Sequence, residues 1–171
     1  METEQQTIPA APTAELFIKI AISNWQLQNT RFNNILDKLT NEQLSEPTAP
    51  GRNTGVYLLG HLTAVSDCML TLFELGDKLY PQLEQPFIKN PESAELEKPS
   101  ITELKEYWHN VNNVLQQKFD TIQPADWFTK HASISAEDFA NEPHRNKLNI
   151  LINRTVHQGY HMGQITYLVK K

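Results

Sequence analysis

Four long segments of the chain carry apolar residues at the three- and four-residue spacing of an amphipathic helix. We expect helices over residues 14–39, 54–76 and 100–122, and from about residue 145 almost to the end. No segment shows the clean alternation of apolar and polar residues that marks a strand. The pattern therefore predicts an all-α fold, a four-helix bundle, whose core can hold a metal site on facing helices.

Signals at the helix ends support this division. Ser100 and Glu103 form a capping box that starts the third helix, and Gly76 is a suitable residue to end the second. Residues 41–53 are expected to be a connection. The segment 79–99 contains four prolines and is the longest irregular stretch, so it could cover a pocket. Long connections before and after the third helix are compatible with a long crossover connection.

Length and composition restrict the class of protein. The 171 residues, 39% hydrophobic and 20% charged, suit a flexible N-terminal arm at residues 1–12 and a single domain at 13–171. A net charge of -5 argues against nucleic acid as a partner. We expect neither a membrane-spanning helix nor a secretory signal in the first residues, and so predict a soluble, cytoplasmic protein.

Three histidines are candidate metal ligands. His157 and His161 are four residues apart in an expected helix, so their side chains share one face. His61 lies in the second helix, on the same face as apolar neighbours that should point into the bundle. Three imidazoles around one ion would leave a coordination position open. The alternative is a set of hydrogen-bonded core histidines, or a surface pair that arose by chance.

The remaining candidate residues are weaker. His109 has an uncertain direction, and His131 and His144 lie in a polar, loop-like segment where we expect them to be solvated. Residue 158 is Gln, so the helix lacks the His-Glu-x-x-His arrangement of metalloproteases. Cys68, the only cysteine, allows no intrachain disulfide and lies too far along the helix from His61 to join its ligands.

Groups that orient the imidazoles through their second nitrogen are also expected. Gln164, Asp67 and Tyr160 are the candidates near the three histidines in sequence. Gly60 and Gly163 stand next to helical histidines at a cost to helix stability. Either close packing of a neighbouring element or room for a ligand would account for them.

Two motifs resemble a known family. Thr54-Gly55-Val56-Tyr57-Leu58-Leu59-Gly60-His61-Leu62 looks like the second-helix motif of the DinB-like (DinB/YfiT) family, and His157-Gln158-Gly159-Tyr160-His161-Met162-Gly163-Gln164-Ile165 resembles its fourth-helix motif. The resemblance implies a four-helix bundle with a long crossover. It also implies one divalent metal ion, zinc or nickel, bound by His61, His157 and His161.

Because that family includes metal-dependent thiol transferases, the resemblance implies an enzyme that joins a low-molecular-weight thiol to an electrophile. A non-catalytic metal or small-ligand binding protein and a metal-dependent hydrolase are the alternatives. Expected partners are a small-molecule substrate and, as a further hypothesis, a second copy of the chain. The homodimer would form if helices bearing Trp25 and Trp108 had apolar outer faces.

Overall fold

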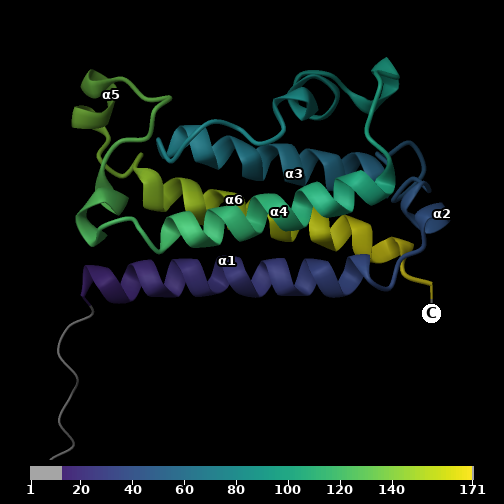
Figure 1. The fold of residues 1–171 in the computed structure, drawn as a ribbon, viewed down its shortest axis with the longest axis horizontal. Helices are drawn as coiled ribbons and strands as arrows, with labels where there is room; N and C mark the ends of the chain where they lie inside the picture. Colours follow the sequence, from purple (N-terminus) through teal and green to yellow (C-terminus); the bar gives the residue numbers. More distant parts are fainter. Residues whose placement is uncertain (1–12, 171) are drawn as a thin grey trace, which may run out of the picture.

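Four long helices lie side by side along the length of the molecule (Figure 1). They are α1 (Ala14–Leu36), α3 (Gly55–Leu72), α4 (Ile101–Phe119) and α6 (Lys147–Ile165). The computed structural model describes residues 13–170, so the expected arm at residues 1–12 lies outside the described residues. The all-α four-helix bundle predicted from the apolar spacing is confirmed.

Short helices occupy the connections. These are α2 (Asn41–Leu44), η1 (Pro81–Leu83), η2 (Gln85–Lys89), η3 (Glu92–Ala94), η4 (Pro124–Phe128), α5 (Ala136–Asn141) and η5 (Thr166–Leu168). Both α2 and α5 lie in segments whose sequence predicts connections. Both begin at a capping residue, Thr40 and Ser135, which accepts a hydrogen bond from the first turn. Helices of this length have too few residues to show an apolar period.

The crossover is the segment between α3 and α4, residues 73–100. Figure 1 shows α3 and α4 running in the same direction, so the chain must return along the whole bundle between them. Helix α6 runs antiparallel to α3 and packs against both α3 and α1. Of the two long connections in the sequence, this one is the crossover, because α6 begins at the end of the bundle where α4 finishes.

Aromatic side chains fill the core between the helices. The Trp25 ring packs edge-on against Phe119, and the Phe32 ring packs in the same way against Trp108. Trp25 and Trp108 are only 2% and 1% exposed. Both tryptophans therefore face the core and add nothing to an outer apolar face of their helices.

An exposed apolar surface lies on α1, the helix that bears Trp25, and on α6. Phe17 and Ile20 from α1 and Ile152 and Val156 from α6 are all exposed and border a groove between the two helices. This face contains the kind of surface that the hypothesis required. The homodimer itself stays a prediction.

The long helices end earlier than the apolar pattern predicts. Helix α3 stops at Leu72 and not at Gly76, because Glu74 takes the left-handed conformation with φ of 60°. The Leu75 amide then donates a hydrogen bond back to the Leu70 carbonyl at 2.8 Å. This is the hydrogen bond that closes a helix end after a left-handed residue, here without glycine.

Helix α3 is the most buried of the four long helices. Among the described helices it alone is long and apolar enough to cross a membrane by composition, and 72% of that stretch is buried in the protein. Its apolar residues contact α4 and α6. Its hydrophobicity is explained by burial inside a bundle, which is consistent with a soluble protein.

Gly60 permits the closest contact between the crossover and α3. A Cβ atom at this position would lie 2.3 Å from the Phe87 ring. Of the two explanations for Gly60, close packing of a neighbouring element is therefore the one observed. Gly163 is different, because it is exposed and a Cβ there would meet nothing within 4 Å.

We predict that Gly60→Ala destabilises the protein by about 2 kcal/mol, because the Phe87 ring must move out of a packed position. Gly159→Ala is the matched control, since its Cβ would enter open space on α6 and alanine favours the helix by about 0.5–1 kcal/mol. Urea denaturation of both variants measures the difference. Equal stabilities would contradict the contact.

Candidate metal centre

Three histidine side chains from two helices converge on one point. His61 extends from α3, and His157 and His161 extend from α6. The Nε2 atom of His157 lies 3.3 Å from that of His61 and 3.0 Å from that of His161. Among the described residues, these three form the one group of His, Cys, Asp or Glu side chains close enough to hold a metal ion. The structure therefore brings together the three histidines that the sequence singled out.

Two hydrogen bonds set the orientation of two of the three imidazoles, those of His61 and His161. The Nδ1 atom of His61 lies 2.7 Å from the Phe87 carbonyl oxygen, and that of His161 lies 2.7 Å from Gln164 Oε1. Because both oxygens only accept, each Nδ1 carries the proton and donates. Each Nε2 then keeps a lone pair that points at the common centre. This is the tautomer that a metal ligand needs.

The donor set fits a divalent ion. Nitrogens bound at 2.0–2.1 Å to a tetrahedral zinc ion are separated by about 3.3–3.4 Å. The measured separations of 3.0 and 3.3 Å are close to this value. The Nδ1 of His157 is buried and has no hydrogen-bond partner among the described residues. Lone pairs converging at this distance repel one another unless a proton or a cation lies between them.

The electrostatics keep the imidazoles neutral. Burial lowers the pKa of His61, although its hydrogen bond to Phe87 partly opposes the shift. Burial also lowers the pKa of His157 to about 4, and the neighbouring His161 and His61 contribute to the same shift. Protonation would place like charges side by side. At neutral pH these two side chains are available as ligands.

Hydrogen bonds attach the crossover to α3 on both sides of Phe87. These attachments keep the Phe87 carbonyl beside His61. The Asp67 carboxylate accepts hydrogen bonds from the Leu79 and Tyr80 amides, both at 2.8 Å. At the other end, the Glu92 carboxylate accepts hydrogen bonds from the amide and hydroxyl of Thr54. Helix η2, a π-helix turn that carries Phe87, lies between these two attachments. Wide turns of this kind are frequent at functional sites.

The three candidates for orienting the imidazoles have different outcomes. Gln164 contacts His161 as expected. Tyr160 packs its ring edge-on against His161, and its hydroxyl accepts a hydrogen bond from Gln164 at 3.4 Å. Asp67 does not reach the histidines, because its carboxylate is engaged by the crossover amides. The orienting group that the sequence analysis missed is the Phe87 carbonyl.

A backbone carbonyl has no side-chain signature, so residue types alone could not identify it. The one available signal was Gly60, whose missing side chain admits Phe87 next to His61.

The other histidines are separate from this centre. His131 is 6% exposed and its Nδ1 lies 2.9 Å from the Ser133 hydroxyl, so the expectation that it is solvated is wrong. It is buried because its segment packs on the end of α3, where the Ala132 amide donates to the Leu72 carbonyl. His109 and His144 are exposed.

Cys68 is also outside the group of ligands. Its side chain is half-buried, and burial raises the pKa of its thiol. A thiol in such surroundings stays protonated and reacts slowly. The structure agrees with its exclusion as a ligand.

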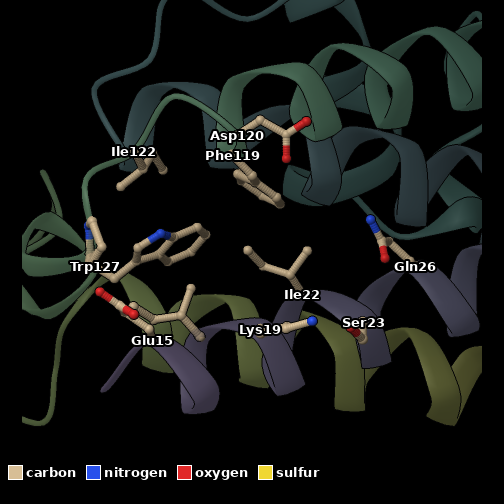
Figure 2. Close-up of a pocket in the computed structure, with 11 residues that line it drawn as sticks. Glu15, Lys19, Ile22, Ser23, Gln26, Phe119, Asp120, Ile122 and Trp127 are labelled. Atoms are coloured by element: carbon tan, nitrogen blue, oxygen red, sulfur yellow. The ribbon is translucent and has the colours of Figure 1, made fainter. Parts of the chain in front are cut away.

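A cavity toward the other end of the bundle contains no histidine. It has a volume of 380 Å³ and lies between the start of α1, the end of α4 and η4. Figure 2 shows Glu15 and Lys19 on one side, and Phe119 and Trp127 on the other. These residues include no cluster of groups suited to metal binding. Its volume alone therefore does not make this cavity the candidate metal site.

Comparison with known proteins agrees with the bundle. A family model described as the DinB superfamily matches residues 25–165. No curated protein is similar enough in sequence to match the chain. The fold is similar to a solved structure described as a conserved protein from Enterococcus faecalis, with a TM-score of 0.65 and 16% sequence identity. The similarity covers 94% of this chain and 98% of that one, and at this identity it shows the fold alone.

The lowered pKa of His157 predicts how acid affects the metal-free protein. In the unfolded chain this imidazole has a pKa of about 6.5, so between that value and about 4 only the unfolded state binds the proton. Stability contributed by this residue is therefore complete above pH 6.5 and is lost as the pH falls. We expect the free energy of unfolding to fall by about 1 kcal/mol more in wild type than in His157→Gln between pH 7.5 and 5, after allowance for partial exposure.

Urea denaturation at the two pH values, with a chelator present, measures this difference. His144→Gln is the control, because that side chain is exposed and should leave the pH dependence as in wild type. An identical loss in wild type and His157→Gln would show that His157 has its ordinary pKa in the folded state.

Proposed function

The chain belongs to the DinB superfamily, and on this basis we propose that it binds one divalent metal ion through His61, His157 and His161. The observation that carries the proposal is the convergence of three Nε2 atoms at the separation of ligands on one ion. Two of the imidazoles are fixed in the required tautomer by Phe87 and Gln164. Zinc and nickel both suit an imidazole donor set.

We further propose that the protein is a metal-dependent transferase that joins a small thiol to an electrophile. When bound, a divalent ion supplies Lewis acidity, which deprotonates a thiol or acidifies a water molecule. The chain's own contribution is to hold three imidazole ligands on one side. All three histidines are half-buried, so each remains partly open to solvent.

The polar groups around the site favour thiol transfer over hydrolysis. His61 donates a hydrogen bond to a backbone carbonyl and His161 donates one to a glutamine side-chain oxygen, and no described carboxylate is bonded to the three histidines. Hydrolysis by a metal-bound water benefits from a nearby general base, which this arrangement does not supply. In transfer, the thiol proton passes to solvent, the sulfur forms a bond to the electrophilic carbon, and the leaving group departs with its bonding electrons.

We place this activity in the cytoplasm, where small thiols are kept reduced. The single cysteine of the chain is free, as expected for that compartment.

Metal content tests the ligand assignment. Protein purified without a histidine tag should contain about one equivalent of metal, and His61→Ala and His157→Ala should each lose most of it, because two imidazoles hold an ion far more weakly than three. His109→Ala is the control, since that side chain is exposed on α4. Elemental mass spectrometry gives both the amount and the identity of the metal. Equal metal content in all four proteins would refute the assignment.

Activity distinguishes the proposed transferase from its alternatives. We expect the metal-loaded protein to accelerate the reaction of 2-mercaptoethanol with an alkyl halide or activated aryl halide, and His157→Ala to reduce the rate at least about 100-fold. Bound metal without turnover of any thiol would indicate a binding protein. Ester hydrolysis without added thiol would instead indicate a hydrolase.

A further inference from the structure

Arg154 shares a face of α6 with two of the three histidines. Residues 154, 157 and 161 are spaced by three and four, so their side chains form one stripe on the helix. The Cα atom of Arg154 lies about 4.5 Å along the axis from that of His157. Helix α3 runs antiparallel to α6 and contacts it (Figure 1). Cys68 is displaced from His61 in the same direction along the bundle, so Arg154 and Cys68 lie on the same side of the histidines.

Arg154 has no counter-ion in the described part of the chain. Its Nε is buried without a hydrogen-bond partner, and no carboxylate there lies within ion-pair distance. The other arginines are in different situations. Arg31 and Arg52 are exposed, and Arg145 bonds to Glu142 at 2.8 Å.

The neighbouring lysine is neutralised. Lys78 pairs with the Glu84 carboxylate, which also accepts from Lys89 at 2.8 Å. The Glu84 carboxylate is therefore already engaged by two lysines. A half-buried guanidinium without an anion is energetically unfavourable, so Arg154 is a site where an external anion would be stabilised.

The effect of this charge reaches the histidines. Burial lowers the pKa of Arg154, but an arginine remains charged at neutral pH. Its positive charge also contributes to the lowered pKa of His61 and His157. A divalent ion on the histidines would add further positive charge to the same region. No acidic side chain among residues 13–170 is bonded to Arg154 there.

We propose that Arg154 binds an oxyanion of the small molecule that reacts at the three histidines. The guanidinium offers parallel N–H donors that fit a carboxylate or a phosphate, and an anion held there is next to the metal ligands. The substrate class is thus a small molecule that bears a carboxylate or a phosphate close to its reacting atom. The inference rests on the proposed function, because it defines the subsite relative to a reaction at the histidines.

The Nε–H signal of Arg154 provides a direct test that requires no activity. In ¹⁵N-labelled protein, the signal that Arg154→Lys removes is the one from Arg154. We expect sodium malonate, and separately inorganic phosphate, to shift this signal in a saturable way in both metal-free and zinc-supplemented protein. The signal of Arg31 is the internal control, because that side chain is exposed. The ratio of the two affinities identifies the preferred oxyanion.

Backbone amide signals of α6 follow the same titration in Arg154→Lys, where the charge remains and the fork of donors is lost. We expect the affinity to fall at least about tenfold, as for loss of a hydrogen bond to a charged group. An Arg154 signal that moves no more than that of Arg31 in both forms overturns the inference. If Arg154→Lys does not fold, Arg31→Lys, Arg52→Lys and Arg145→Lys assign the other three Nε–H signals, the remaining one is that of Arg154, and the wild-type titration decides.

Metal analysis separates this result from the proposed function. Metal bound by the histidines with no anion bound by Arg154 overturns the inference and leaves the proposed function intact. Anion binding at Arg154 in a protein that takes up no zinc or nickel supports the anion site and overturns the metal-dependent function.

Discussion

The hydrogen bond from His61 to the Phe87 carbonyl joins the two parts of the molecule on which the site depends. Through this hydrogen bond the crossover fixes the orientation of the His61 imidazole on α3. Without it the crossover would be only a long connection over the surface. The contact exists because Gly60 lets the Phe87 ring pack against α3. Asp67 and Glu92 hold the crossover in place on either side. The Phe87 carbonyl oxygen therefore connects the packing of the crossover on α3 with the tautomer of His61.

Helix α6 contributes the other half of the centre by a simpler route. Its three- and four-residue spacing places Arg154, His157 and His161 on one stripe, and the contact with α3 turns that stripe toward His61. Gln164, one turn beyond His161, orients that imidazole within the same helix. One side of the site is thus built from local helix geometry, and the other requires a segment far away in sequence.

The charges around the histidines explain why neutral ligands persist there. Burial and mutual repulsion both disfavour protonation of His157, and Arg154 adds to the effect. Glu84 is engaged by Lys78 and Lys89, and no described carboxylate pairs with Arg154. The result is a half-buried, positively biased region that favours neutral imidazoles, in agreement with the proposed metal and anion sites.

The sequence by itself determined the four helices and the His157–His161 pair, because helical period and i,i+4 spacing are local properties of the chain. His61 was identified by its place on an apolar helix face and by the family motif. The sequence also identified Gln164, which acts within one turn. Only the tertiary structure decided which connection is the crossover, that Phe87 reaches His61 and that Asp67 does not. It also buried His131, although that residue lies in a polar loop. These outcomes depend on contacts between segments distant in sequence, and a backbone carbonyl or a missing counter-ion has no signature in residue order.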